Sequence, residues 1–456
     1  MTSNTSLNTI LAKLNTLASF EKTANLLDLS PLASMKQLLR ALGNPEQRYK
    51  IIHIAGTNGK GQTAAIISRL LTEAGFRVGL YTSPTVLDVR EGIQIDNEFI
   101  REDAFVAGGE AVLNTIEEHQ EDFCPSYFDT MTAIAFYAFY QQQVDWAVIE
   151  TGMGGTTDST NTAPKEIAVI TPISHDHSAF LGESLEDIAE SKLGIVTHAM
   201  PVILASQQID IKQYIIKKLQ ERGCTPIDSD RITITPHYPE DRYTFVFIGG
   251  ETFSLSSPER RIPRPTLECI KTALTTISLI KETTLDERRR YAQAALAVSL
   301  PGRLQLCHEI KYKPSGAILP TVLFDGGHNA AALQALHEHL HVLGIKDYSL
   351  VLGMAQDKLL EHINAPLRTL CAEAGRIILC QASSARAAST DALQHFILAL
   401  SRESEKKIIK AESVQDALHL VATEQVGAVI IAGSFYLLQE AFPWFELPHS
   451  VPRPNC

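Results

Sequence analysis

Residues 51–63 read Ile-Ile-His-Ile-Ala-Gly-Thr-Asn-Gly-Lys-Gly-Gln-Thr, an apolar run that leads directly into a glycine-rich turn. The apolar part is interrupted only by His53 and is typical of a strand buried on both faces of a parallel sheet. After the turn, apolar residues recur at the spacing of one helix face, at Ala64, Ile67, Leu70, Leu71 and Ala74. We therefore predict a strand, a loop and a helix in that order.

The glycine-rich turn has the composition of a phosphate-binding loop. Between a strand and a helix, backbone N–H groups and the helix N-terminus can surround a polyphosphate, while Lys60 supplies a positive charge. The strict Walker sequence is not met, because Ile54 stands where its first glycine belongs and Gly61 follows the lysine. The alternative is a glycine-rich turn with a solvated lysine, but the strand–loop–helix context favours a nucleotide phosphate site.

Strand-like runs alternate with helical patterns along the chain, which predicts an α/β fold with mostly parallel sheets. Further runs of this kind lie at 78–82, 145–150, 167–171 and 202–205. A turn-forming segment at 299–302 interrupts the pattern, which then restarts, so we predict two α/β domains, 1–299 and 300–456. Alternation of period two within 232–253 predicts a small antiparallel sheet in the first domain.

The composition is that of a packed globular protein, with 456 residues of which 45% are hydrophobic and 20% charged. The formal net charge of −12 argues against a general binder of nucleic acid or of anionic membranes. The seven cysteines are scattered, which is typical of reduced thiols in a cytoplasmic protein. No apolar stretch approaches the ~20 residues that a membrane span needs. We therefore expect a cytoplasmic protein that binds neither nucleic acid nor membranes.

Acidic and histidine side chains follow two of the later strand-like runs. Glu150 ends one run, at the edge where open α/β sheets place ligands, and a carboxylate there can hold a hard cation. On its own, such a glutamate more often faces a loop or caps a helix. His175 and His177 follow the next run, and their i, i+2 spacing without a third ligand nearby makes a zinc pair a weak alternative.

Residues 53–61 resemble the signature of the Mur ligase superfamily, and specifically that of the folylpolyglutamate synthase/dihydrofolate synthase family. Further matches occur in the family's order over about residues 50–440. They are Tyr81-Thr82-Ser83-Pro84, Ser126-Tyr127-Phe128, Glu150-Thr151-Gly152-Met153-Gly154-Gly155, Asp158-Ser159-Thr160-Asn161, Asp176-His177, Lys192-Leu193-Gly194-Ile195, Leu300-Pro301-Gly302-Arg303, Asp325-Gly326-Gly327-His328-Asn329, Asp357-Lys358 and Gly433-Ser434. One such match is weak evidence, but ten in order identify the chain as a member of this family.

The resemblance implies a fold and a reaction. The fold would be a P-loop central domain of the Mur ligase type, followed by a smaller, Rossmann-like α/β domain that binds glutamate. The reaction would be the ATP-dependent addition of L-glutamate to dihydropteroate, to (tetrahydro)folate or to both, as part of folate biosynthesis and one-carbon metabolism. ATP would phosphorylate the pterin carboxylate, and the amine of glutamate would then displace phosphate. Mg²⁺ would accompany ATP, and the enzyme would be a monomer.

The resemblance also implies roles for particular residues. Those expected to contact ATP are Gly56, Thr57, Asn58, Gly59, Lys60, Gly61, Gln62, Arg303 and Asp325. Those expected to bind magnesium are Glu150, His177 and Lys192, and the catalytic residues would be Lys60, Lys192 and His177. Those expected to bind glutamate or the other substrate are His328, Ser434, Ser83, Pro84, Tyr127 and Phe128.

Lys192 has the least usual of these implied roles. It lies on a helix whose start is marked by Ser184 and Asp187, the spacing of a capping box. Taken alone, it would be a solvated helix lysine. By resemblance it aligns with a lysine that CO₂ converts to a carbamate, which replaces a cation with an anion that can bind a metal. Only an uncharged amine reacts in this way.

Several residues depart from the family's pattern. Gln62 stands where a Ser or Thr hydroxyl binds magnesium, and Thr156 stands in place of an arginine. Thr85 replaces a histidine, and Thr266 lies in the stretch where an adenine-side Asn is expected. These changes leave three alternatives open. The protein could be a ligase with an altered pterin specificity, a ligase that catalyses only one of the two glutamate additions, or a paralogue that binds ATP without ligating. Another Mur-type ligase is a further alternative, which the folate-type turn argues against.

Overall fold

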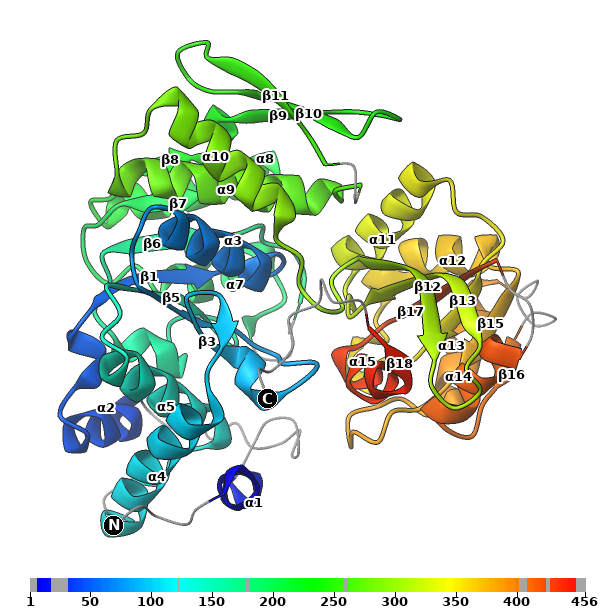
Figure 1. The fold of residues 1–456 in the computed structure, drawn as a ribbon, viewed down its shortest axis with the longest axis horizontal. Coiled ribbons are helices and arrows are strands. Elements are labelled where there is room, and N and C mark those ends of the chain that lie inside the picture. The colour runs from blue at the N-terminus through cyan, green and yellow to red at the C-terminus, as the bar shows by residue number, and fades with distance from the viewer. Residues whose placement is uncertain are drawn as a thin grey trace. The chain divides into compact units, whose positions relative to one another are not determined.

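The computed structural model describes residues 6–17, 32–121, 123–176, 181–257, 261–401, 408–423 and 427–447. They fold as two compact units, the first ending at Val298 and the second beginning at Ser299 (Figure 1). Each unit combines helices with a mostly parallel sheet, which confirms the α/β class predicted from the alternation of strands and helices. Within the described residues, no helix is both long enough and apolar enough to span a bilayer.

The first unit is built on a sheet whose strands lie in the order β4-β3-β2-β5-β1-β6-β7-β8. These strands are β1 Lys50–Ala55, β2 Val78–Tyr81, β3 Ile93–Ile95, β4 Glu98–Phe99, β5 Trp146–Glu150, β6 Ile167–Ile170, β7 Val202–Leu204 and β8 Pro226–Asp228. All pair in parallel except β3 and β4, which turn back at one edge. The glycine-rich turn therefore leaves the sheet from its interior, between β5 and β6.

Helices cover this sheet in separate groups. They are α1 Leu7–Thr16, α2 Leu32–Ala41, α3 Lys60–Glu73, α4 Glu102–Glu118, α5 Tyr127–Gln141, α7 Leu185–Leu193, α8 Ile209–Glu221, α9 Arg264–Ile280 and α10 Leu285–Ala297. The helix after the glycine-rich turn, α3, packs against α9 and α10, whereas α5 packs against α4, α2 and α1. The strand, loop and helix predicted around residues 51–74 are thus β1, the turn and α3.

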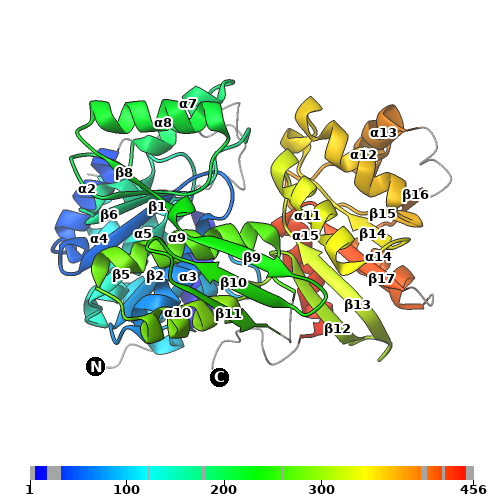
Figure 2. The same cartoon turned by 90° about the horizontal axis from the view of Figure 1, so that it is seen from above.

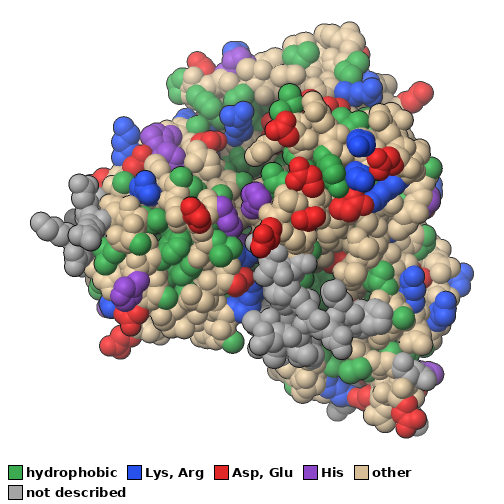
Figure 3. Space-filling view, turned by 180° about the vertical axis from the view of Figure 1, so that it is seen from behind, with side chains coloured by type: hydrophobic (Ala, Val, Ile, Leu, Met, Phe, Trp, Pro, Cys, Tyr) green, Lys and Arg blue, Asp and Glu red, His purple; other side chains and the backbone are tan. Residues whose placement is uncertain are grey.

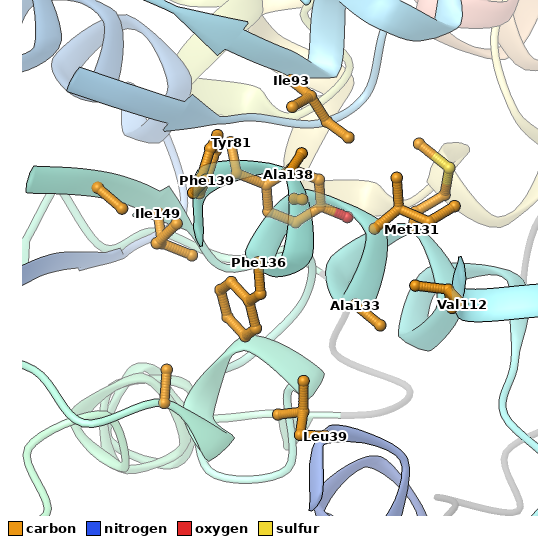
Figure 4. Close-up of a cluster of buried hydrophobic side chains, with 14 of the residues drawn as sticks. Leu39, Tyr81, Ile93, Val112, Met131, Ala133, Phe136, Ala138, Phe139 and Ile149 are labelled. Carbon is orange, nitrogen blue, oxygen red and sulfur yellow. The ribbon is translucent and has the colours of Figure 1, made fainter. Parts of the chain in front are cut away.

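The helix α5 is rich in apolar residues. Most of them are buried, because the sheet and other helices cover this helix. Figure 4 shows Phe136 and Phe139 of α5 beside Tyr81 of β2 and Ile149 of β5, all buried in one hydrophobic cluster. Burying each such aromatic ring contributes about 1.5–3 kcal/mol. This cluster fixes the positions of the ends of β2 and β5. Ser83 follows β2, and Glu150 is the last residue of β5.

A separate antiparallel sheet lies in the first unit, as the alternation of period two predicts. Its strands are β9 Thr233–His237, β10 Arg242–Val246 and β11 Thr252–Ser256, in the order β11-β10-β9 (Figure 2). Tyr243 and Phe245 of β10 are fully buried, and Phe245 stacks on Phe253 of β11. The alternating apolar residues therefore form the covered face of this sheet.

The second unit has its own sheet, in the order β16-β15-β14-β17-β13-β12-β18. Its strands are β12 Gln305–Tyr312, β13 Ile318–Asp325, β14 Ser349–Leu352, β15 Arg376–Leu379, β16 Ile408–Lys410, β17 Ala428–Ala432 and β18 Phe445–Glu446. Its helices are α11 Ala330–Leu343, α12 Asn364–Glu373, α13 Thr390–Leu400, α14 Val414–Thr423 and α15 Phe435–Ala441. The strands are parallel except β12 and β18, which pair antiparallel at one edge.

Charged side chains of both signs are distributed over the protein. On the face drawn in Figure 3, acidic and basic side chains are interspersed. Ion pairs such as Lys311–Glu446 and Arg101–Asp103 join neighbouring charges at exposed positions. Exposed pairs of this kind contribute little to stability, so both units depend mainly on their apolar cores.

Candidate active site

The glycine-rich turn is hydrogen-bonded to the loop that follows β6. The Thr57 hydroxyl donates to the carbonyl oxygen of Ser174 at 3.1 Å, and the Asn58 amide donates to the Ser174 hydroxyl at 2.9 Å. At Gly56 a Cβ atom would come within 1.9 Å of the Thr171 hydroxyl oxygen, so only glycine fits there. The turn is therefore fixed in shape by its neighbours at the N-terminus of α3.

Lys60 begins α3, directly after Gly59, whose φ of 79° places it in the left-handed region. The Lys60 ammonium lies 3.4 Å from the carbonyl oxygen of Thr57, so the side chain folds back over the turn. The positive charge and the N-terminus of α3 are thus brought to the same place, where both favour an anion.

Glu150 lies beside the glycine-rich turn, on the adjacent strand. In the register of β1 and β5 it is the partner of Ile54, two residues before Gly56. Its carboxylate is buried and accepts a hydrogen bond from the Ser83 backbone N–H at 3.0 Å. This contact brings the Ser83-Pro84 segment after β2 to the carboxylate and fixes its orientation.

Phe128 and Tyr127 lie at the start of α5, next to the loop that follows Glu150. A Cβ atom at Gly152 would come within 2.5 Å of the Phe128 ring, so this ring packs directly on the loop backbone. The Phe128 ring also lies 6.1 Å from that of Tyr81, at the end of β2. The aromatic residues at 127–128 are therefore placed near Glu150 and Ser83.

Lys192 approaches the turn from a distant part of the chain. It lies in the last turn of α7, is 4% exposed, and donates from Nζ to the Gly56 carbonyl oxygen at 2.8 Å. The predicted capping box is present, with Ser184 and Asp187 bonded reciprocally. The turn, Glu150 and Lys192 are therefore three neighbours in one region of the first unit.

The loop after Glu150 is locked onto the end of α7. The Thr156 N–H and hydroxyl both donate to the Ser191 carbonyl oxygen, at 2.9 and 3.0 Å. Because the last carbonyls of a helix lack partners within it, Thr156 caps α7 from outside. Thr156, at the position where the resemblance implies an arginine, therefore has a structural role beside Lys192.

Gly155→Ala tests this close packing of the loop against α7. An alanine Cβ would come within 2.8 Å of the Lys192 carbonyl oxygen and 2.9 Å of that of Ser191. Overpacking of this kind costs about 1–3 kcal/mol, so we expect a lower free energy of unfolding, measured by denaturant titration. Gly108→Ala is the matched control, because its Cβ would meet its nearest atom at an ordinary 3.5 Å. Equal stability of the two variants would contradict the packing.

Of the remaining predicted residues, Gln62 is described by the structure and His177 is not. The Gln62 side chain is buried and its amide donates to the Val298 carbonyl oxygen at 3.4 Å. Gln62, at the position where the resemblance implies a hydroxyl residue, thus contacts the last residue of the first unit. His177 lies outside the described residues, and Asp176, the last described residue before it, is buried.

In the second unit, the predicted residues gather at the carboxyl ends of β13 and β17. Asp325 and Ala432 are partners in the register of these strands. His328 follows Asp325, and its Nδ1 lies 2.9 Å from the Gly326 carbonyl oxygen, which requires a proton on that nitrogen. Ser434 follows β17 and caps α15, where its hydroxyl accepts from the Leu437 N–H at 3.2 Å.

Arg303 and Asp325 are brought together in the second unit by the segment before β12. The Asp325 carboxylate accepts hydrogen bonds from the backbone N–H groups of Leu304, at 3.2 Å, and Gly327. The Arg303 guanidinium lies 4.9 Å from the centre of the Phe435 ring, a cation–π contact. Burial raises the pKa of Asp325 to about 6, although these hydrogen bonds and the charge of Arg303 oppose it.

The raised pKa of Asp325 predicts a pH-dependent stability. In the unfolded chain this carboxyl loses its proton near pH ~4, whereas the folded protein holds it to about pH 6. The stabilisation is therefore complete below pH ~4 and is lost as the pH rises through about 6. Relative to Asp325→Asn, the wild type should lose on the order of 3 kcal/mol of unfolding free energy over this range, measured by denaturant titration. Parallel pH profiles for the two proteins would contradict the prediction.

Asp158, which lies in one of the matched motifs, and Ser174 anchor the site, a role that was not predicted from the sequence for either residue. The Asp158 carboxylate accepts from the Met153 N–H at 2.9 Å and from the Thr160 N–H at 3.1 Å, and so shapes the loop after Glu150. Ser174 anchors the glycine-rich turn. The Asp158-Ser-Thr sequence is typical of a side chain that caps a turn, which is the signal that could have identified Asp158.

Comparison with known proteins shows the family to which the chain belongs. The Mur ligase middle domain matches residues 54–231, a range that contains the glycine-rich turn, Glu150 and Lys192. Folylpolyglutamate synthase of Lacticaseibacillus casei is 32% identical over 334 residues, which cover 70% of this chain and 74% of that protein.

Solved structures agree over almost the whole chain. Mycobacterium tuberculosis folylpolyglutamate synthase complexed with ADP superposes with a TM-score of 0.80 and 26% identity, covering 96% of this chain and 97% of the other. A bifunctional folylpolyglutamate synthase/dihydrofolate synthase with Mn, AMPPNP and L-glutamate bound gives a TM-score of 0.77 and 25% identity, covering 96% and 98%. The chain belongs to the folylpolyglutamate synthase/dihydrofolate synthase family of ligases.

Proposed function

We propose that this chain is an ATP-dependent amide ligase that adds L-glutamate to dihydropteroate, to (tetrahydro)folate or to both. The observation that carries the proposal is the meeting of the glycine-rich turn, Glu150 and Lys192 in the first unit, where Nζ of Lys192 lies 2.8 Å from the Gly56 carbonyl oxygen. A phosphate-binding turn beside a buried carboxylate is what phosphoryl transfer from ATP requires.

The reaction needs ATP because a carboxylate is a poor electrophile. An oxygen of the pterin carboxylate attacks the γ-phosphorus of ATP, ADP leaves, and an acyl phosphate forms. The amine of glutamate then attacks the carbonyl carbon, and inorganic phosphate leaves with one of the original carboxylate oxygens. The protein's contribution to the first step is positioning and stabilisation of the charge on the transferred phosphoryl group.

In this proposal the polyphosphate lies on the backbone N–H groups of residues 56–61, with the Lys60 ammonium beside it. The donor set at Glu150 fits a hard divalent cation, since its buried carboxylate is oriented by the Ser83 N–H and oxygen ligands suit Mg²⁺. Glu150 and His177 would hold Mg²⁺, which when bound neutralises negative charge on the phosphates. Lys192, as a carbamate, would supply a second anionic group.

The remaining residues are proposed to bind the substrates. Ser83, Pro84, Tyr127 and Phe128 are proposed to bind the pterin substrate, because the Ser83 N–H donates to Glu150 and the Phe128 ring packs on Gly152, close to where the pterin carboxylate must come to be phosphorylated. In the second unit, Arg303 and Asp325 are proposed to bind ATP. His328 and Ser434, at the ends of neighbouring parallel strands, are proposed to bind the incoming glutamate, because ligands of open α/β sheets gather at that edge.

The proposal is tested by incubating the protein with ATP, Mg²⁺, L-glutamate and either dihydropteroate or tetrahydrofolate. We expect phosphate release that depends on both a pterin and glutamate, together with a product one glutamate longer in mass. Omission of each substrate in turn is the control. ATP binding without turnover on either pterin would contradict the proposal and favour a nucleotide-binding protein without ligase activity.

A further inference from the structure

A cluster of metal-ligating side chains lies on α11 and α12 of the second unit. The Nε2 atoms of His337 and His341 lie 3.0 Å apart, and they lie 3.1 and 3.0 Å, respectively, from Oε1 of Glu373. The three atoms thus form a nearly equilateral triangle. None of these residues belongs to the sites described above.

Packing of α11 and α12 fixes the positions of the three residues that form this triangle. His337 and His341 are four residues apart on α11, so they project from the same face of the helix. Leu336 and Leu340, one position earlier, are fully buried in the core that α11 shares with α12. Glu373 is the last residue of α12. The backbone positions of the three ligands are therefore fixed by apolar packing, and little ordering remains to be done when an ion binds.

While Glu373 is ionised, no placement of protons on the two imidazoles makes all three contacts of the triangle favourable. If both imidazoles donate from Nε2 to Glu373, the two donor nitrogens face each other at 3.0 Å without a shared hydrogen bond. If one imidazole instead accepts at Nε2, its lone pair faces the carboxylate oxygen. A cation above the triangle would interact favourably with all three atoms at once. An ion at the ~2.0–2.1 Å that is typical of Zn–N and Zn–O bonds can be equidistant from three atoms spaced in this way.

We propose that His337, His341 and Glu373 form a binding site for a divalent transition metal of the Zn²⁺ class. Imidazole nitrogens suit Zn²⁺, Ni²⁺ and Cu²⁺, whereas Mg²⁺ selects oxygen ligands, so this ion differs from the one expected to accompany ATP. Three protein ligands leave a coordination position for water. The His341 side chain is 49% exposed, so an ion can enter from solvent.

The position of the site indicates a structural role. His341 lies eleven residues after the start of α11, or ~16 Å along the helix axis from the end that follows Asp325 and His328. An ion there would join the last turn of α11 to the end of α12, elements that already share the core. It would stabilise the second unit rather than take part in ligation.

The test is a titration of the full-length protein with Co²⁺ and then Zn²⁺, in the presence of excess Mg²⁺ and ADP to occupy the nucleotide site. We expect the visible absorption of one Co²⁺ per chain with nitrogen ligands, which Zn²⁺ abolishes by displacement. His341→Ala and Glu373→Gln should weaken Zn²⁺ binding by about 100-fold or more, since even residues outside the first coordination sphere contribute about 10–100-fold. His395→Ala, which removes an exposed histidine from α13, is the matched control and should bind normally.

Thermal unfolding provides a second readout that does not involve activity. Zn²⁺ should raise the unfolding temperature of the wild type and of His395→Ala, and should leave that of His341→Ala unchanged. Circular dichroism establishes that each variant is folded before titration. The same Zn²⁺ affinity in His341→Ala, Glu373→Gln and the wild type would overturn the proposal, as would the absence of a Co²⁺ spectrum in the wild type.

Discussion

Lys60→Ala should lower kcat/KM for pterin-dependent phosphate release by about 10²–10³-fold, the usual cost of removing one charge-stabilising group from a transition state. The Lys60 ammonium lies over the glycine-rich turn, 3.4 Å from the Thr57 carbonyl oxygen, at the N-terminus of α3. Its loss removes the positive charge that the proposal places beside the transferred phosphoryl group. Steady-state phosphate release with the preferred pterin measures the effect.

Two further variants separate this role from a general loss of charge. Lys60→Arg keeps the positive charge and should retain more activity than Lys60→Ala. Lys36→Ala removes an exposed lysine from α2 of the same unit and should leave the rate unchanged. If Lys60→Ala turned over at the wild-type rate, the phosphate-binding role of the turn would be wrong.

Lys192→Ala should also lower turnover by about 10²–10³-fold, because it removes a group that is proposed to act beside the phosphates. Lys192 is 4% exposed and its Nζ donates to the Gly56 carbonyl oxygen in the glycine-rich turn. If the working form is a carbamate, the alanine variant lacks an anion at this place. Added acetate or propionate should then restore part of the activity, measured as phosphate release against carboxylate concentration.

The specificity of this rescue is tested on a second buried lysine. Lys165 lies in the same unit, hydrogen-bonded to Asn161, and burial lowers its pKa to about 8. Lys165→Ala should show no carboxylate-dependent gain, because its amine is not part of the proposed site. Full activity of Lys192→Ala would make Lys192 a structural lysine. A defect that no carboxylate relieves would contradict the carbamate.

The local parts of the fold could be predicted from the sequence because their signals lie in consecutive residues. The strand, turn and helix around Lys60 follow from an apolar run, three glycines within the six residues that follow it, and a helical period. The start of α7 at Ser184 follows from the spacing of its capping box. The antiparallel sheet of β9, β10 and β11 follows from alternation of period two.

The long-range contacts of the site could not be predicted in this way. Thr156 and Ser191 are 35 residues apart, and their contact depends on how α7 packs beside the loop after Glu150. Strand β12 was not expected, because half of its residues are polar and it lies at an antiparallel edge of its sheet. The His337–His341 pair is visible in the sequence, but its partner Glu373 depends on the packing of α11 against α12.

Transfer of a carboxylate oxygen tests the ligase account most directly. The pterin substrate is prepared with ¹⁸O in its carboxylate and incubated with the protein, ATP, Mg²⁺ and L-glutamate. If an acyl phosphate forms and glutamate displaces its phosphate, each inorganic phosphate released should carry one ¹⁸O atom and the new amide should retain the other, as measured by mass spectrometry. Unlabelled phosphate, formed while both labelled oxygens stay with the pterin, would show that ATP is hydrolysed without activating the carboxylate and would contradict the account.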